Sequence, residues 1–405
     1  MEKIKEGIFA DLHIHSKFSR ATSKNLSFEN LVRYAKIKGV GLLGTGDFTH
    51  PKWLDEIKKL REDRGLFYFN DFPFVLTGEI SLMYTQGRGR RVHLVLLAPS
   101  LAVVEKINNY LDGKGRRDYD GRPIFKISCE EFTKEMMKID DKIEIICAHC
   151  MTPWFGIFGS MSGFNSLKEA FGEQERNIHA IETGMSADPL MLQHFSFLND
   201  KAIISFSDAH SFWPFRLGRE ATIFSKIESY QDLIRQIREK SYLGTIETDP
   251  AYGKYHYDGH RLCKFSCSPE ETKKLNGICP ICKKELTIGV ENRVEELTDQ
   301  DTDKNPGRKP YYKLLPLHEI IALAKASTLA SRKTWQVYNL LIEKFGNEFN
   351  ILLNVRKDEL FGALPDDEKL VELILENRLG KIKVKPGYDG EYGIPMLAEK
   401  QEKLF

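Results

Sequence analysis

Short apolar runs recur through the first 225 residues, and helix-sized or loop-like stretches separate them. Strands that alternate with helix-sized segments are typical of a β/α architecture with a mainly parallel sheet or barrel. The chemistry of such folds gathers at the carboxyl ends of the strands. The runs predict strands at residues 7–14, 40–45, 74–79, 92–98, 143–148, 179–182 and 202–206.

Histidine and carboxylate side chains stand at or near the ends of these predicted strands. His13 and His15 point to one side of their strand, because alternate residues share a face. One histidine at a strand end is usually a hydrogen-bonded structural residue, but so many nitrogen and carboxylate groups would overfill one tetrahedral ion. They predict two or three clustered divalent ions of Zn, Mg or Mn. The predicted ligands are His13, His15, Asp47, His50, Glu79, His93, His149, Glu182, Asp208 and His210.

Several of these motifs together resemble the polymerase-and-histidinol-phosphatase (PHP) domain family. They are the HxH of the first strand, TGDFTH at 45–50, Glu79, CAHC at 147–150 and SDAH at 207–210. The resemblance covers about residues 5–225 and implies a distorted (β/α)7 barrel around a trinuclear metal site that hydrolyses phosphoesters. Many PHP domains have Thr-Asp-His where this chain has GDF at 46–48, so either Asp47 or His50 fills this ligand position.

Longer strings are similar to the endonuclease Q family and cover most of the chain. They are GTGDFTHPKW (44–53), AHCMTPWFGIFGS (148–160), SDAHSFWPFRLGREAT (207–222), YHYDGHRLC (255–263) and PGYDGEYGIP (386–395). This resemblance implies a DNA repair endonuclease that cuts the phosphodiester 5′ to deaminated bases (uracil, hypoxanthine, xanthine) and abasic sites. The products would be a 3′-hydroxyl and a 5′-phosphate.

Hydrolysis of a phosphodiester needs an activated water and a stabilised leaving oxygen, and clustered metal ions supply both. We predict Asp208, Glu79 and His210 as the catalytic residues, with Glu79 or Asp208 bridging two ions. Two other functions stay open: a PHP-type small-molecule phosphatase, such as a histidinol-phosphatase-like enzyme, and a non-catalytic DNA-binding scaffold. The cysteine cluster and the arginine loops argue against the phosphatase, because a small phosphomonoester substrate needs neither. The full set of metal ligands argues against a scaffold without activity.

Contacts to DNA must come from local basic patches, because the net charge is only +1. Glycine-spaced arginines suit phosphate contacts. One stretch precedes the fourth predicted strand, and the other lies in a polar loop that continues to Arg122. The predicted DNA-binding residues are Arg88, Arg90, Arg91, Arg116 and Arg117.

A damaged base inside a duplex is reached by flipping it into a pocket with stacking surfaces. Aromatic side chains directly follow the predicted ligands His149 and His210. They either form such a pocket or only close the rim of the barrel. The residues predicted for the base pocket are Trp154, Phe155 and Trp213.

Four of the seven cysteines crowd into residues 263–282, in the pattern Cys263-x3-Cys267-x11-Cys279-x2-Cys282. Two such pairs predict one structural zinc ion in a closed tetrahedral site. The x3 spacing is looser than usual, so His260, or with less support His256, is an alternative to Cys267. Cys147 and Cys150 have no second pair and are interpreted as core and rim residues.

Apolar residues at helical spacing predict a helical region over 316–378. We expect a PHP barrel over 1–248, a zinc-binding module over 249–292 and a mainly helical, DNA-contacting region over 293–405. Gln401 resembles the start of a sliding-clamp docking motif. No apolar run approaches the roughly 20 residues of a membrane span, so we expect a cytoplasmic protein. From the resemblance to endonuclease Q, we expect damaged DNA as its partner.

Overall fold

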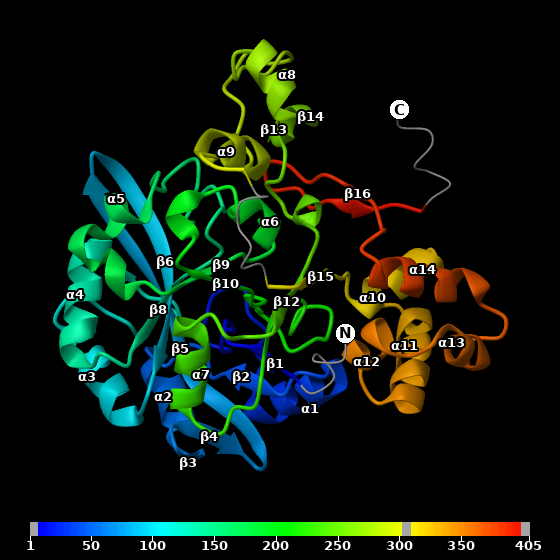
Figure 1. Cartoon of the computed structure of the whole chain (residues 1–405), viewed down its shortest axis with the longest axis horizontal. Helices are drawn as coiled ribbons and strands as arrows, with labels where there is room; N and C mark the ends of the chain where they lie inside the picture. Colours follow the sequence, from blue (N-terminus) through cyan, green and yellow to red (C-terminus); the bar gives the residue numbers. More distant parts are fainter. Residues whose placement is uncertain (1–6, 302–308, 398–405) are drawn as a thin grey trace.

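The computed structural model describes residues 7–301 and 309–397, which form a curled mixed sheet, a small cysteine module and a helical region (Figure 1). The strands of the sheet follow the order β10-β9-β8-β6-β5-β2-β1-β11-β12-β15, and β3, β4 and β7 pair beside this path. Their bounds are β1 Ile8–Asp11, β2 Leu42–Gly44, β3 Arg61–Asp63, β4 Leu66–Phe69, β5 Phe72–Gln86, β6 Arg88–Ala98, β7 Ile124–Phe125, β8 Glu144–Cys147, β9 Ala180–Glu182, β10 Ala202–Ile204, β11 Ala221–Phe224, β12 Gly244–Glu247 and β15 Tyr311–Lys313.

The sheet is less parallel than the sequence predicts. β5 and β6 form a long antiparallel hairpin, because Gly87 has a positive φ of 70° and turns the chain straight back. β6 therefore also runs antiparallel to β8, and β1–β11 and β11–β12 are antiparallel as well. The strands β11 and β12 were not among those predicted. The α/β class with a curled sheet and a helical C-terminal region is confirmed.

The two flanks of the sheet approach each other next to β1. The Ser205 amide, just after β10, donates to the Thr222 hydroxyl of β11 at 3.0 Å. Ile14 forms an isolated parallel bridge with Ala209. These contacts bring the segments after β1 and after β10 to the same end of the sheet, where both carry predicted metal ligands.

Helices cover the outside of the sheet, and serine N-caps define where many of them begin. The Ser27, Ser100, Ser128 and Ser229 side chains each accept an amide hydrogen of the first helical turn that has no partner within its helix. The helices are α1 Phe28–Lys38, α2 Pro51–Ile57, α3 Leu101–Asp112, α4 Cys129–Ile139, α5 Leu167–Phe171, α6 Pro189–Leu192 and α7 Tyr230–Arg238, with 3-10 turns at Gly172–Asn177, Ser196–Leu198, Pro250–Tyr252 and Arg261–Cys263.

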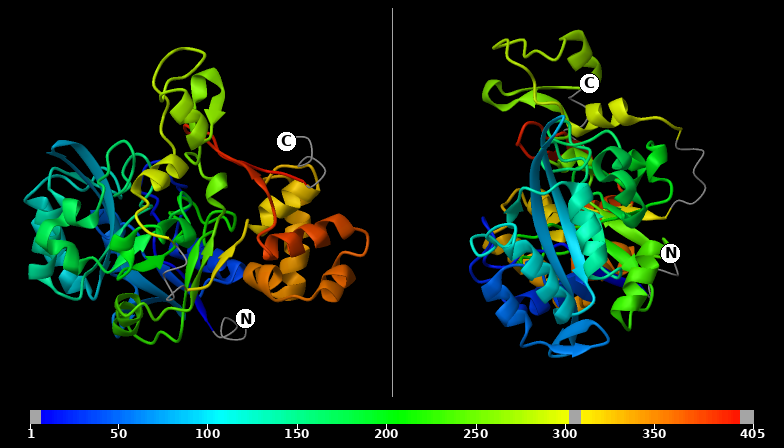
Figure 2. Two further views of the ribbon diagram at one scale, coloured as in Figure 1. Left: turned by 45° about the horizontal axis from the view of Figure 1, so that its top comes forward. Right: turned by 90° about the vertical axis from the view of Figure 1, so that its left-hand side faces the viewer.

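The cysteine module stands away from the sheet in every view (Figure 1 and Figure 2). It contains β13 Asp258–His260, β14 Phe265–Cys267 and α8 Pro269–Lys274, and α9 Val290–Leu297 lies at its base. Arg293 of α9 donates to the backbone oxygens of Phe158 and Phe164 at 2.9 and 3.0 Å, which fastens the base to the barrel.

The helical region contains α10 Leu317–Ala324, α11 Arg332–Phe345, α12 Glu348–Leu353, α13 Lys357–Ala363 and α14 Glu368–Arg378. After it, the short pair β16 Val384–Lys385 and β17 Ile394–Pro395 leads the chain back toward the cysteine module (Figure 1). β15 comes from the segment expected to belong to the C-terminal region, yet it pairs with β12 in the large sheet. None of the helices in the described ranges has both the length and the apolar character needed to cross a membrane.

A buried ion pair joins the helical region to the barrel. The Lys38 ammonium of α1 lies 2.6 Å from Glu348 Oε1 of α12 and donates to the Pro214 oxygen at 2.9 Å. Glu348 also accepts hydrogen bonds from the Leu317 amide and the Tyr338 hydroxyl. Pro214 belongs to the loop that follows the SDAH motif, so this pair links three segments.

Lys38→Met is expected to destabilise the protein by about 3–5 kcal/mol, because it leaves the buried Glu348 carboxylate without its cation. Urea unfolding monitored by fluorescence measures the change. The matched control is Lys58→Met, which removes the exposed pair between Lys58 and Glu105 at 2.9 Å. Its effect is expected to stay within about 1 kcal/mol. Equal losses in the two variants would contradict the prediction.

Candidate metal centre

Four predicted ligands from three parts of the barrel converge directly after β1. His13, His15, Glu79 and Asp208 each offer one ligand atom, and these atoms all lie within 4.8 Å of one another. His15 Nε2 is 3.0 Å from Asp208 Oδ1 and 3.2 Å from Glu79 Oε2, and His13 Nε2 is 3.4 Å from the same Glu79 oxygen. This group has the nitrogen and carboxylate donors that suit a divalent cation.

A second group shares Glu79 with the first. His93 Nδ1 is 2.8 Å from Glu79 Oε1, and His149 Nε2 is 3.4 Å from that oxygen. Glu79 therefore presents one carboxylate oxygen to each group. The sheet register explains the contact with His93. Glu79 of β5 pairs with Val95 of β6, and His93 lies two residues from Val95 and therefore on the same face.

Two further predicted ligands contact the Nδ1 atoms of His13 and His15. Glu182 lies 2.9 Å from His13 Nδ1 and also accepts the His149 amide at 2.7 Å. Asp47 lies 2.9 Å from His15 Nδ1 and accepts the Ser16 amide. Carboxylates in this position select the tautomer that leaves Nε2 free for a metal. His13 Nε2 is buried without a hydrogen-bond partner among the described residues and faces the Glu79 and Asp208 carboxylates at 3.4 and 3.6 Å, so the donor set fits a cation.

Strained backbone marks three of the residues at these strand ends. Asp47, His149 and Asp208 have positive φ angles of 45°, 30° and 50°. Such conformations are uncommon for residues other than glycine and cluster at functional sites. Here they turn each side chain inward at the point where its strand has ended.

The charges of the centre favour cations. Burial opposes protonation of His13 and His15, but the surrounding carboxylates outweigh it and raise the pKa of both. Burial likewise opposes ionisation of Glu79, but Arg122 and the histidines hold its pKa well below the ordinary value. The centre thus retains ionised carboxylates, which bound cations would neutralise.

The other two predicted ligands lie at or beyond the edge of these groups. The His210 ring is 4.5 Å from the His15 ring, and its Nδ1 is 3.6 Å from Asp208 Oδ1. His50 stacks on Phe18 at 4.5 Å and belongs to neither group. Of the two alternatives, Asp47 thus contacts His15, whereas His50 lies outside both candidate metal groups.

Arg122 was not predicted as a site residue, yet its Nη1 lies 3.0 Å from Glu79 Oε2. In the sequence it stands at the end of a polar, glycine-containing loop with no apolar pattern. Nothing local distinguishes it from Arg116 and Arg117, which are bound by Asp118 and Asp112.

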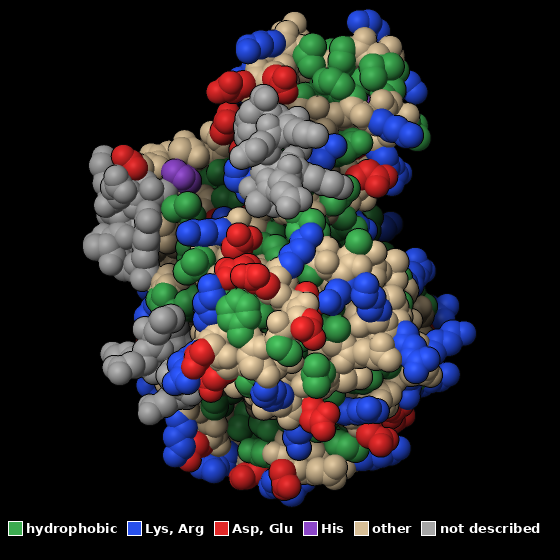
Figure 3. Space-filling view, turned by 90° about the vertical axis from the view of Figure 1, so that its right-hand side faces the viewer, with side chains coloured by type: hydrophobic (Ala, Val, Ile, Leu, Met, Phe, Trp, Pro, Cys, Tyr) green, Lys and Arg blue, Asp and Glu red, His purple; other side chains and the backbone are tan. Residues whose placement is uncertain are grey.

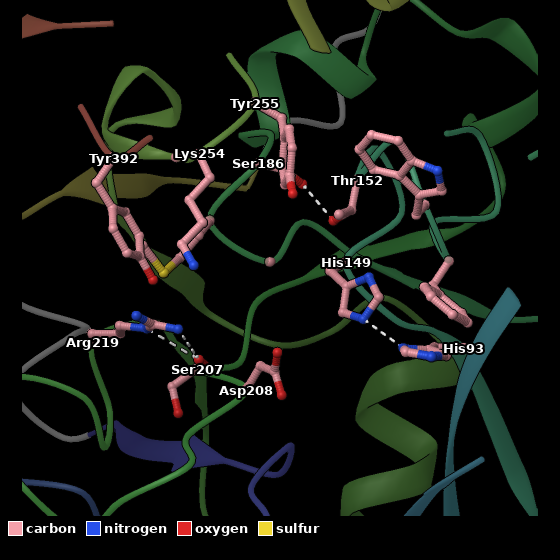
Figure 4. Close-up of a pocket in the computed structure, with 15 residues that line it drawn as sticks. His93, His149, Thr152, Ser186, Ser207, Asp208, Arg219, Lys254, Tyr255 and Tyr392 are labelled. Carbon is pink, nitrogen blue, oxygen red and sulfur yellow. Dashed lines mark hydrogen bonds between the residues drawn. The ribbon is translucent and has the colours of Figure 1, made fainter. Parts of the chain in front are cut away.

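A pocket of about 510 Å³ opens beside the centre (Figure 4). His93, His149 and Asp208 border it, as do the predicted Trp154 and Phe155. Phe155 stacks on His93 at 4.2 Å. Trp213 instead packs against Trp335 of α11, with ring centroids 5.5 Å apart. Other polar and aromatic residues line the pocket, and local sequence patterns do not group them because they are scattered along the chain. They are Thr152, Ser186, Ser207, Arg219, Lys254, Tyr255 and Tyr392.

The arginines predicted to bind DNA differ in their surroundings. Arg90 is buried, lies over the Phe164 ring and pairs with Glu169 at 2.7 Å. Arg88 donates to the Gly163 oxygen at 3.0 Å but remains exposed, as does Arg91. The position of Arg90 makes it a structural residue of the hairpin, whereas Arg88 and Arg91 stay accessible.

The cysteine module brings together His260, Cys263, Cys279 and Cys282, whose ligand atoms lie within 4.8 Å of one another. Cys267 lies outside this group, and its sulfur is 3.2 Å from the Thr272 hydroxyl. The alternative with His260 as fourth ligand is therefore the one that the geometry favours. Leu262 and Ile281 are exposed beside the group, and Figure 3 shows hydrophobic side chains gathered on this module among Lys and Arg.

Two buried carboxyl groups stand behind the pocket wall. Ser205 Oγ is 3.2 Å from Glu220 and 3.1 Å from Glu247. Glu220 accepts the Met185 amide at 2.7 Å, so it holds a residue of that wall. Burial raises the pKa of Glu220 from 4.5 to about 7, and burial raises the pKa of Glu247 as well.

Because the pKa of Glu220 is higher in the folded than in the unfolded chain, the free energy of unfolding is highest below pH 4.5, where this carboxyl is protonated in both states. It falls as the pH rises through about 7. We expect Glu220 to contribute roughly 3 kcal/mol to a decrease in stability across this window. Glu220→Gln should flatten the decrease, as measured by urea unfolding at pH 5 to 8. Glu228→Gln, at an exposed position, should leave it unchanged; an unaltered slope in Glu220→Gln would contradict the prediction.

The helical region matches a known protein family. The family described as the MJ0043 C-terminal domain matches residues 316–381. The uncharacterized protein MJ0043 of Methanocaldococcus jannaschii is 33% identical over 288 residues, which are 69% of this chain and 34% of that protein. The chain spans about a third of the length of this relative.

The curled sheet and its histidine–carboxylate groups define an α/β protein with a candidate clustered metal centre. The lesion-specific endonuclease PfuEndoQ from Pyrococcus furiosus matches with a TM-score of 0.87 and 30% identity, over 98% of this chain and 97% of that one. An endonuclease Q in complex with a 27-mer duplex carrying an abasic lesion matches with a TM-score of 0.88 and 31% identity, over 97% of each chain. The chain belongs to the endonuclease Q family.

Proposed function

We propose that the protein is a metal-dependent DNA repair endonuclease that hydrolyses the phosphodiester 5′ to a lesion and leaves a 3′-hydroxyl and a 5′-phosphate. The observation that carries the proposal is the similarity, over nearly the whole chain, to an endonuclease Q with an abasic lesion at its active site. The histidine–carboxylate groups beside an open pocket support it with the chemistry that this reaction needs.

His13, His15, Glu79 and Asp208 would hold one divalent ion, and Glu79, His93 and His149 a second. Bound ions of Zn, Mg or Mn would lower the pKa of water and stabilise the leaving oxygen. Glu182 and Asp47 orient His13 and His15. His210, at the edge of the centre, is placed to hold a proton near Asp208, so Asp208, Glu79 and His210 are the proposed catalytic residues.

The pocket suits an extruded lesion. Trp154 and Phe155 offer stacking surfaces, and Lys254 and Arg219 bring hydrogen-bond donors (Figure 4). Deamination replaces an amino group, which donates, with a carbonyl oxygen, which accepts. Hydrogen-bond donors on the wall therefore favour uracil over cytosine, hypoxanthine over adenine and xanthine over guanine, and an abasic site enters without a base.

Other parts of the chain would serve the same reaction. Arg88, Arg91 and Arg116 are accessible for phosphate contacts, and the cysteine module would hold one structural zinc ion. We propose domains at 1–248, 249–292 and 293–405. The clamp motif that begins at Gln401 lies outside the described residues and stays a sequence-based proposal.

The test uses end-labelled duplexes that contain uracil, hypoxanthine or an abasic site, incubated with Mg²⁺ or Mn²⁺ beside an undamaged duplex and a simple phosphomonoester. The proposal expects a nick 5′ to each lesion, which is lost in Asp208→Ala. Cleavage of only the phosphomonoester would point to a small-molecule phosphatase. Binding of the lesion duplex without cleavage would point to a scaffold.

A further inference from the structure

Arg122 reaches the one carboxylate that both candidate metal groups share. Its Nη1 is 3.0 Å from Glu79 Oε2, the oxygen that also lies 3.2 Å from His15 Nε2. Its side chain is 27% exposed, and among the described residues Glu79 is the one side-chain acceptor that this guanidinium contacts. The remaining N–H groups of the guanidinium are therefore available to a ligand at the centre.

The loop that carries Arg122 is built against the centre. A Cβ atom on Gly121 would lie 2.1 Å from Asp47 Oδ2, the carboxylate that orients His15. The Asp120 carboxylate accepts the Arg122 amide at 3.2 Å, and the Ser81 amide donates to the Pro123 oxygen at 3.0 Å. The position of Arg122 is thus set by the same segments that place the candidate metal ligands.

A guanidinium at this place opposes the binding of cations. Once metal ions share the charge of Glu79, Arg122 faces them as a like charge at short range. The arrangement becomes favourable when an anion lies between the ions and the arginine. A phosphodiester is such an anion, and its non-bridging oxygens match the planar fork of an arginine.

We infer that Arg122 is a catalytic residue that binds the non-bridging oxygens of the scissile phosphate at the metal centre. This inference rests on the proposed function. The attacking water gives up one proton as its oxygen forms a bond to phosphorus, the bond from phosphorus to the 3′-oxygen breaks, and the 3′-oxygen takes up a proton, so that no net proton is gained or lost. Arg122 stays protonated throughout and donates to the oxygens on which negative charge grows.

The experiment compares the wild type with Arg122→Gln, Arg122→Lys and Arg122→Gly. Single-turnover cleavage of an abasic duplex gives the chemical step, and Mn²⁺ titration without DNA gives metal affinity. Arg122→Gln is expected to slow cleavage by about 10²–10³-fold, with Mn²⁺ affinity unchanged or higher. The cleavage rate of Arg122→Lys should fall between those of the wild type and Arg122→Gln. Added guanidinium should raise the cleavage rate of Arg122→Gly at least about tenfold. Arg61→Gln, on exposed β3, is the matched arginine control.

Cleavage by Arg122→Gln within about threefold of wild type would overturn the inference, and so would a loss of Mn²⁺ affinity that parallels the loss of rate. The second result would mean that Arg122 only holds Glu79. Hydrolysis of bis(p-nitrophenyl) phosphate separates the two proposals. A wild type that cleaves this diester but no lesion duplex refutes the DNA substrate, while Arg122→Gln still tests the arginine. A wild type that cleaves neither refutes both.

Discussion

Glu79→Gln is expected to lower cleavage of lesion DNA by roughly 10³-fold or more and to reduce the number of metal ions bound per chain. One oxygen of Glu79 faces His13 and His15, and the other faces His93 and His149. A single substitution therefore removes a ligand from both groups. Metal analysis after dialysis and single-turnover cleavage measure the two effects.

The substitution keeps the size of the side chain, so circular dichroism should show an intact fold. Glu105→Gln is the control, because Glu105 is exposed, pairs with Lys58 and belongs to neither candidate metal group. Metal content and rate should match the wild type there. Full metal occupancy with a normal rate in Glu79→Gln would show that Glu79 is not the shared ligand.

His260→Ala is expected to release the zinc ion proposed for the cysteine module, whereas Cys267→Ser should keep it. The ligand atoms of His260, Cys263, Cys279 and Cys282 converge, while the Cys267 sulfur is turned toward Thr272. Structural zinc contributes apparent binding energies of about 10–16 kcal/mol in small domains, so loss of one ligand should unfold the module. Zinc analysis and limited proteolysis of the intact chain report the result.

Cobalt substitution makes the test sharper. Charge-transfer absorption from thiolate to Co²⁺ grows with the number of sulfur ligands, so it distinguishes a site of three cysteines and one histidine from a site of four cysteines. Cys282→Ser is the positive control, since it removes one of the converging ligands. Loss of zinc from Cys267→Ser, with retention in His260→Ala, would restore the four-cysteine interpretation.

Local patterns in the sequence were sufficient for many of the elements and for most of the residue types that meet at the centre. The period of two places His13 and His15 on one face. The predicted strand ends lie within three residues of the ends of β1, β2, β6, β8, β9 and β10. The helical spacing over 316–378 likewise corresponds to α10–α14. These features depend on neighbours along the chain, which a sequence displays directly.

Strand direction and pairing were harder, because they depend on contacts between distant segments. The turn at Gly87 reverses β6, and β15 returns to the barrel sheet from beyond the cysteine module. Neither pairing leaves a mark in the local apolar pattern, since a strand has the same period in either direction.

What the sequence by itself determined is which chemical groups this protein can bring together: histidines, carboxylates and cysteines at the ends of predictable elements. Only the tertiary structure decided which atoms meet. It placed Glu79 between two groups, turned Asp47 and Glu182 toward the histidines, and set His260 beside the cysteines. It also brought Arg122 to Glu79 across 43 positions of the chain. A ligand is defined by angstrom-scale distances between atoms, and those distances arise only when distant segments pack against one another.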